Sequence, residues 1–300
     1  MTERFRRLSR NAYLMLVAAT MMWAGNSIIG KIAIGEVTPM TLTFMRWFLV
    51  CAILALFYRG DAAAAWPVLR PRWRWVVAMS VLGYTVFNAL VYAAAHHTSG
   101  VNLTMLQSSI PVMVLIGAAI VFRTRIGGLQ ALGTVLTVVG VLVVASGGDI
   151  GRILRLGFNV GDLYVLIACA LYAGYTLGLR KRPATSGFAL FIGFAVVAMV
   201  SSLPLLVWEA ATGEFFWPSL VGWGILAYVT LCPSLLSQIF YIRGVELIGP
   251  TRAGLFINLI PIFGAVMAVL VLGEPFGWQE VAAAALVFGG IAVAEAGKRG

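Results

Sequence analysis

Charged residues are scarce in this 300-residue sequence, at 11% of the total. A soluble globular domain uses roughly 25% charged residues to cover its surface. Residues 75–122 contain no Asp, Glu, Lys or Arg, and neither do residues 126–148, 183–208, 215–242 and 253–273. Because about 20 apolar residues of helix cross a bilayer, each stretch is long enough for one span and the first for two. The shortage of charge therefore excludes a water-soluble fold.

Cysteine and histidine are rare as well. Cys51, Cys169 and Cys232 all fall inside apolar stretches, where we interpret them as small buried hydrophobic residues, not as disulfide partners. The two histidines, His96 and His97, are adjacent, whereas a metal site needs more ligands at helical spacing. We therefore expect no metal site and no cofactor.

The apolar stretches and the turn residues between them predict ten transmembrane helices. We place these helices at about 12–33, 39–58, 74–95, 99–121, 126–145, 161–179, 187–208, 219–242, 249–271 and 278–295. The arginines before the first span resemble the start of a signal peptide, but the apolar segment is long and nine more follow it, so we expect an uncleaved span. The fold class predicted is an all-α integral membrane protein.

The basic residues predict how the chain is oriented, because Lys and Arg near span ends stay on the cytoplasmic side. With the N-terminus inside, sixteen of the 21 basic residues lie in inner segments and three in outer ones, while Arg46 and Arg252 lie within spans. This imbalance favours cytoplasmic N- and C-termini. It also explains the net charge of +10 without invoking nucleic acid.

An internal repeat divides the chain into two halves, 1–148 and 149–300. Ile110-Pro111 matches Ile260-Pro261 and Gly140-Val141 matches Gly290-Ile291, each at an offset of 150 residues. Because each half has an odd number of spans, five, the second half enters the membrane from the opposite side. Such inverted repeats around a central cavity are typical of secondary transporters that work by alternating access.

These features resemble a known family. Ten spans, short loops, glycine-rich fifth and tenth helices, Pro111 and Pro261 in the fourth helix of each half, and Leu272-Gly273-Glu274-Pro275 after the ninth span are similar to the EamA-type members of the drug/metabolite transporter superfamily. Residues 92–111 (YAAAHHTSGVNLTMLQSSIP) resemble most the YddG-type exporters of aromatic and neutral amino acids. In the first half, Phe122-Arg123-Thr124-Arg125 replaces the Gly-Glu that the family has after the fourth helix.

Polar and aromatic side chains recur along several spans. Since a polar group in hydrocarbon is costly, such stripes tend to face a cavity or a neighbouring helix. Tyr84, Asn88 and Tyr92, for example, follow one another at four-residue steps. For single residues a packing role competes with a binding role, but for the stripes together we favour a substrate cavity. The predicted substrate-binding residues are Trp23, Asn26, Tyr84, Asn88, Tyr92, Gln107, Ser108, Tyr175, Gln238, Tyr241 and Arg252.

Two arginines and two prolines are interpreted separately. Arg252 could meet a substrate carboxylate or extend to the cytoplasmic interface. Arg46 lies deeper, in the second span. We favour a structural role for it, in which its side chain pairs with backbone carbonyls or with Glu36. Pro111 and Pro261 remove helical hydrogen bonds and are the candidate hinges.

The function predicted is a transporter, not an enzyme, in the cytoplasmic (inner) membrane. Intramembrane enzymes need clustered titratable groups, and the spans have none at their centres. The same absence of titratable groups at the span centres favours uniport without proton coupling.

The resemblance implies export of small neutral or aromatic amino acids. Carriers of other metabolites, cationic drugs or phosphorylated and nucleotide-linked substrates stay open, as does a non-transporting scaffold. We expect a small-molecule substrate and lipid as partners, no nucleic acid, and a monomer or a homodimer through the fifth and tenth helices.

Overall fold

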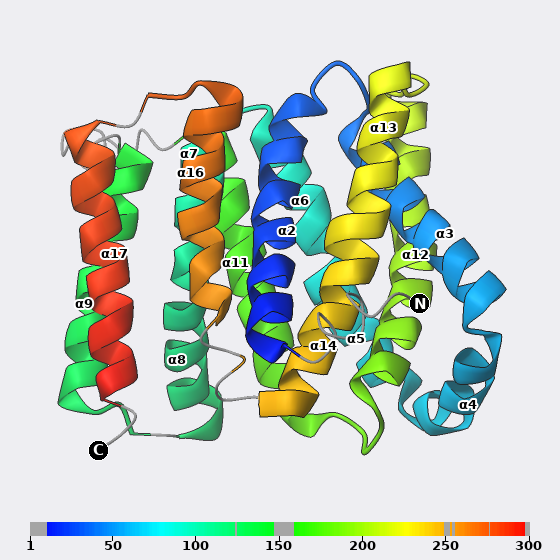
Figure 1. The fold of residues 1–300 in the computed structure, drawn as a ribbon, viewed down its shortest axis with the longest axis horizontal. Coiled ribbons are helices and arrows are strands. Elements are labelled where there is room, and N and C mark those ends of the chain that lie inside the picture. The colour runs from blue at the N-terminus through cyan, green and yellow to red at the C-terminus, as the bar shows by residue number, and fades with distance from the viewer. Residues whose placement is uncertain are drawn as a thin grey trace.

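The protein is a bundle of helices. The computed structural model describes residues 11–123, 125–146, 159–248, 253, 256–275 and 277–297, and the regular structure in these ranges is entirely helical (Figure 1). The prediction of an all-α chain is confirmed for these residues.

The first half contributes α2 (Ala12–Ile32), α3 (Pro39–Phe57), α4 (Arg59–Leu69), η1 (Arg70–Arg72), α5 (Trp73–Ser80), η2 (Val81–Val86), α6 (Phe87–Ala95), α7 (Gly100–Met105), η3 (Leu106–Ser108), α8 (Ser109–Phe122) and α9 (Gly128–Ser146). The second half contributes α11 (Val160–Gly178), η4 (Leu179–Lys181), α12 (Gly187–Ala211), α13 (Leu220–Val229), η5 (Thr230–Leu236), α14 (Ser237–Ile248), η6 (Phe256–Leu259), α16 (Ile260–Leu272) and α17 (Trp278–Ala296).

Seven helical segments in the described residues are long and apolar enough to cross a membrane. Three further apolar helices are shorter within the described residues, namely Gly128–Val143, Phe256–Leu272 and Trp278–Ala294. The chain is thus a multi-pass membrane protein, whereas ten complete spans and the sidedness of the termini stay predictions. Arg252 and the boundary between the halves at residue 148 lie outside the described residues.

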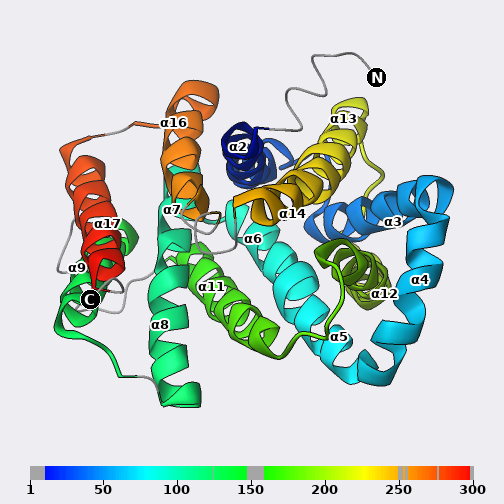
Figure 2. The same ribbon diagram turned by 60° about the horizontal axis from the view of Figure 1, so that its bottom comes forward.

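One expected connection is itself helical. The expected spans leave residues 59–73 as a connection, but α4 and η1 fill this stretch and continue into α5. Asp61 in the first turn of α4 suits the positive end of the helix dipole. Ala65 and Leu69 of α4 are buried, and α4 contacts α12 at the edge of the bundle (Figure 2).

The long helices alternate in direction, so the bundle has two chemically distinct ends (Figure 1). We call one the acidic end, which carries Glu36, Asp162, Glu209, Glu274 and Glu280, and the other the basic end, which carries Arg59, Arg72, Arg74, Arg180 and Arg243. The two halves of the chain interlace instead of packing as separate bodies. First-half helices α2, α3, α6 and α9 contact second-half helices α14, α12, α11 and α17, respectively.

Two segments wind as π-helix, and they occupy corresponding places in the halves. These are η2, between α5 and α6, and η5, between α13 and α14. In η5 the cause is visible. Pro233 lacks the N–H that would bond the carbonyl of Val229, and the hydroxyl of Ser234 donates to that oxygen instead, at 2.5 Å. Such π-turns occur frequently at functional sites.

The candidate hinge prolines share a setting. Pro111 lies in the first turn of α8 after the 3-10 turn η3, and Pro261 lies in the first turn of α16 after the 3-10 turn η6. A proline in a first turn interrupts little, because its missing N–H has no partner inside the helix. The irregular backbone lies in the 3-10 turns η3 and η6, which come before the prolines.

Helices α9 and α17 form a pair at one flank of the bundle (Figures 1 and 2). Their small residues face each other. A Cβ added at Gly133 would lie 2.3 Å from the carbonyl oxygen of Gly290, and one added at Gly140 would lie 2.7 Å from Val287. The glycine faces are thus used for close packing inside the chain. The homodimer through these helices stays a prediction and would use their other faces.

Candidate functional site: a buried arginine beside an aromatic cluster

A single guanidinium organises the polar centre of the bundle. Arg46, on α3, is 3% exposed and donates hydrogen bonds to side chains from three other segments. Its Nη1 lies 2.7 Å from Asn88 Oδ1, 2.5 Å from the Tyr92 hydroxyl and 3.3 Å from Asn26 Oδ1. Its Nε and Nη2 both donate to Ser234 Oγ, at 2.9 and 2.7 Å. We call these five residues the Arg46 centre.

The expectation for Arg46 was wrong. We predicted pairing with backbone carbonyls or with Glu36, but its hydrogen bonds go to four neutral side chains. Glu36 instead bonds Ser219 at the acidic end. The partners of Arg46 lie on α2, α6 and η5, and a pattern within the second span cannot reveal them.

Three of the predicted substrate-binding residues meet in this centre. Asn26, Asn88 and Tyr92 all contact the guanidinium, and the Tyr92 hydroxyl also donates to Asn26 Oδ1 at 2.7 Å. Asn88 is fixed by its amide, which donates to the carbonyl of Tyr84 at 2.6 Å. The structure thus brings together residues 26, 88 and 92 from two helices, and whether they bind substrate stays a prediction.

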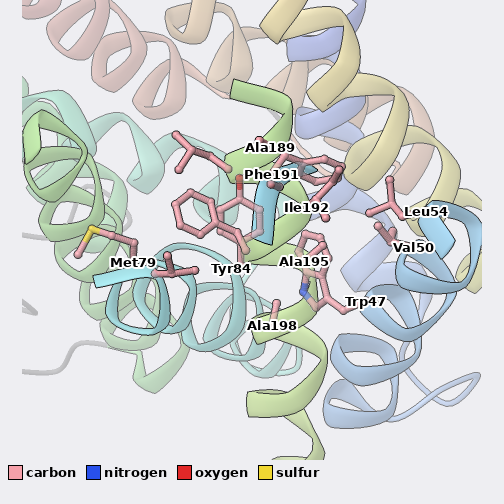
Figure 3. Close-up of a cluster of buried hydrophobic side chains, with 14 of the residues drawn as sticks. Trp47, Val50, Leu54, Met79, Tyr84, Ala189, Phe191, Ile192, Ala195 and Ala198 are labelled. Atoms are coloured by element: carbon pink, nitrogen blue, oxygen red, sulfur yellow. The ribbon is translucent and has the colours of Figure 1, made fainter. Parts of the chain in front are cut away.

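An aromatic cluster adjoins the Arg46 centre. The guanidinium carbon lies 5.0 Å from the ring centre of Trp47, within the range of a cation–π contact. Trp47 packs on Tyr84 with ring centres 5.2 Å apart, and Tyr84 in turn contacts Tyr175 at 5.8 Å and Phe194 at 5.4 Å. Figure 3 shows Trp47 and Tyr84 beside the helix that carries Ala195 and Ala198. The predicted residues Tyr84 and Tyr175 therefore form an apolar wall next to the charge.

The other predicted residues that the structure describes are not among the hydrogen-bond partners found for Arg46. Trp23 stacks on Tyr241 at 5.2 Å, and its indole N–H donates to the carbonyl of Pro233 at 3.1 Å. Gln107 donates to Ser27 Oγ at 3.0 Å. Ser108 is buried, and no hydrogen bond of its hydroxyl is found in the described residues. Gln238 is half-buried.

Two buried carboxylates of the second half bond to the first half at the acidic end. Glu209 is 2% exposed and accepts from the backbone N–H groups of Met40 at 2.9 Å and Thr41 at 3.1 Å, at the start of α3. Asp162 is likewise buried against Thr98 of the first half. At the same end, partial burial and then the charge of His97 lower the pKa of His96 below its usual range, which favours the neutral imidazole at pH 7.

Arg46, Trp47 and Ser234 are the components of this site that the sequence did not lead us to select. One signal was present for Arg46, an arginine two turns inside an apolar span without an acidic residue in that span. No comparable signal marks Trp47, since buried tryptophans are ordinary in apolar helices. Ser234 gains its role from the π-turn that Pro233 induces.

An all-helical membrane bundle with polar side chains converging inside it is typical of multi-pass membrane transporters. The model of the EamA-like transporter family matches the chain twice, at residues 10–146 and 159–295. The chain belongs to the EamA-like transporter family.

Curated relatives agree with this assignment. The chain is 25% identical to the uncharacterized transporter YyaM of Bacillus subtilis (strain 168), over 95% of this chain and 93% of that protein. It is 23% identical to the uncharacterized inner membrane transporter YicL of Salmonella typhimurium, over 89% of both chains. A solved crystal structure with 16% sequence identity superposes with a TM-score of 0.64 over 94% of this chain and 96% of its own, which shows a shared fold.

Proposed function

We propose that this transporter exports small neutral or aromatic amino acids, or related metabolites, across the cytoplasmic membrane by alternating access. The observation that carries the proposal is the Arg46 centre, where a cation and neutral polar groups adjoin an aromatic cluster inside the bundle. Such a combination suits a small molecule with a polar end and an apolar body. The name of the relative YicL, an inner membrane transporter, supports the location.

Alternating access rests on the repeat. The two matches of the family model begin at residues 10 and 159 and end at residues 146 and 295, an offset of 149 residues at both ends. The π-turns η2 and η5 begin at the same offset, at Val81 and Thr230. Two copies of one unit, inserted in opposite directions, supply two arrangements of similar energy between which the chain can rock.

A uniport mechanism fits the distribution of acidic groups. Every Asp or Glu side chain that the structure describes lies within about one turn of a helix end or in a connection. Proton-driven carriers usually place a titratable group at membrane depth as a relay. The described spans have none there, so transport follows the substrate gradient.

Phosphorylated substrates suit the described interior less well. A phosphate group is usually held by several basic side chains. Away from the ends of the bundle, Arg46 is the only basic residue in the part of the chain that the structure describes.

Uptake by purified protein in liposomes tests the proposal. The panel contains labelled neutral and aromatic amino acids together with cationic dyes, and empty liposomes give the background. We expect saturable uptake of amino acids, reduced by Tyr92→Phe, which removes a hydroxyl 2.5 Å from Arg46, and by Gln238→Ala. Tyr13→Phe, at a side chain that is 56% exposed, is the matched control and retains the wild-type rate. Uptake of dyes but not of amino acids would contradict the proposed substrate class.

A further inference from the structure

Among the residues that the structure describes, no acidic side chain pairs with the positive charge of Arg46. In the described residues the one salt bridge joins Arg243 and Glu246, both half-exposed at the basic end. Arg46 is 3% exposed, and its hydrogen-bond acceptors are two amides and two hydroxyls. An ionised group removed from water without an opposite charge is costly, so a site of this kind favours an anion.

The guanidinium presents its bidentate edge to a single oxygen atom. Nε and Nη2 form the fork that usually holds the two oxygens of a carboxylate. Here both nitrogens donate to one hydroxyl oxygen, Ser234 Oγ. The Ser234 hydrogen is directed to the carbonyl of Val229, so its oxygen acts toward Arg46 as an acceptor. A neutral oxygen thus holds the place that suits a carboxylate.

The partner at this edge belongs to the other half of the chain. Asn26, Asn88 and Tyr92 come from the same half as Arg46 and hold Nη1. Ser234, on η5, comes from the second half and holds the Nε/Nη2 edge. Movement of the second half relative to the first would therefore release the fork while leaving the arginine positioned by its own half.

We propose that Arg46 binds the carboxylate of the transported molecule through its Nε/Nη2 edge, and that Ser234 holds this edge in place of the carboxylate. The aromatic residues Trp47, Tyr84 and Tyr175, which adjoin the guanidinium, would then contact an aromatic or apolar body of the same molecule. The required feature of the substrate is then the carboxylate and not the amino group. This inference rests on the proposed transport function and names the group that the site recognises.

Four small molecules with one aromatic skeleton separate the groups. Phenylalanine carries both charges, 3-phenylpropionate carries the carboxylate alone, and phenylalaninamide and phenethylamine carry the amine without a carboxylate. Ligands that bind the folded state raise the melting temperature of the purified, detergent-solubilised protein. We expect phenylalanine and 3-phenylpropionate to raise the melting temperature, with an effect that saturates as their concentration increases. We expect phenylalaninamide and phenethylamine to leave the melting temperature unchanged.

Variants of the arginine locate the effect. Arg46→Lys keeps the charge but loses the fork, and we expect the apparent affinity for 3-phenylpropionate to fall roughly tenfold or more. Ser234→Ala removes the competing acceptor and keeps or strengthens acid binding. Arg72→Gln is the matched control, since Arg72 donates to the carbonyl of Lys181 in the other half at the basic end, and it retains wild-type affinity.

Each outcome decides the inference. Equal stabilisation by phenylalaninamide and phenylalanine, wild-type affinity in Arg46→Lys, or no stabilisation by either acid would overturn it. The comparison of phenylalanine with phenylalaninamide uses the wild-type protein alone. It therefore tests the inference even where a substitution prevents folding. Transport of phenylalaninamide in liposomes would support the transport function and refute the carboxylate role. Binding of the acids without any transport would support the carboxylate role and refute the transport function.

Discussion

The carboxylate of Glu274, which follows α16, lies 2.6 Å from the backbone nitrogen of Gly100, the first residue of α7. Its second oxygen accepts from the N–H of Val101 at 2.8 Å. A carboxylate at this place satisfies two N–H groups without helical partners and suits the positive end of the helix dipole. The Gly-Glu sequence after the ninth span thus joins the two halves at the acidic end.

Removal of this cap should weaken the fold. We expect Glu274→Ala to lower the free energy of unfolding by about 1–2 kcal/mol. The measurement is thermal melting in detergent. Glu214→Ala is the control, because Glu214 is exposed at the same end and none of the described hydrogen bonds involves its side chain. Equal melting of the two variants would contradict the capping role.

Arg123 occupies in the first half the place of Gly273 in the second. Both end their helix with a left-handed residue, with φ of 52° at Arg123 and 66° at Gly273. A side chain in this region costs roughly 1 kcal/mol relative to glycine. Arg123→Gly should therefore raise the melting temperature and Gly273→Ala should lower it. A fall on Arg123→Gly would show that contacts of the arginine outweigh the backbone cost.

Neighbouring glycines on α17 should respond in opposite ways. A Cβ added at Gly290 would lie 2.6 Å from the carbonyl oxygen of Gly133, whereas one added at Gly289 would have no neighbour within 4 Å among the described residues. We expect Gly290→Ala to cost about 1–3 kcal/mol through overpacking. Gly289→Ala should be neutral or slightly stabilising, since alanine favours helix. Thermal melting of both variants checks the pair, and similar values would argue against the close packing of α9 on α17.

The prolines beside the 3-10 turns should affect rate more than stability. With Pro111→Ala and Pro261→Ala together, the turns η3 and η6 can relax into continuous helix. We expect the initial rate of uptake in liposomes to fall severalfold while the melting temperature is kept or raised. An unchanged rate in the double variant would remove these prolines as hinges.

In the described part of the chain no carboxylate lies at membrane depth, and this predicts that transport is insensitive to a proton gradient. Initial uptake should be equal in liposomes with the same pH on both sides and in liposomes with a pH gradient at the same external pH. Ionophore-treated liposomes serve as the control for membrane potential. Transport that stops when the gradient is abolished would contradict uniport.

The sequence predicted the spans well because gaps in charge set them directly. The expected segments 12–33, 39–58 and 187–208 agree with α2, α3 and α12 within a few residues. The helix α4 was missed, since Arg59 and Asp61 indicate a loop and Pro67 usually interrupts a helix. The π-turn η2 was missed because a one-residue change of register leaves no trace in an apolar sequence, whereas the π-turn η5 was missed although Pro233 lies in it.

The site was predictable only in part, and for a physical reason. Four-residue spacing placed Asn88 and Tyr92 on one face of a helix, and both reach Arg46. The spacing could not show what that face meets, because the guanidinium arrives from α3 and the serine from η5. Charge inside a span indicated that Arg46 has a partner, but the identity of the partners depends on tertiary packing.

The interlaced halves also determine when this protein can assemble during synthesis. Helix α9 ends at Ser146, but its small residues pack against α17, which begins only at Trp278. Contacts between segments so distant in sequence form late, since the intervening chain has to be made first. The small-residue face of α9 therefore stays without its partner until the ribosome has made almost the entire polypeptide.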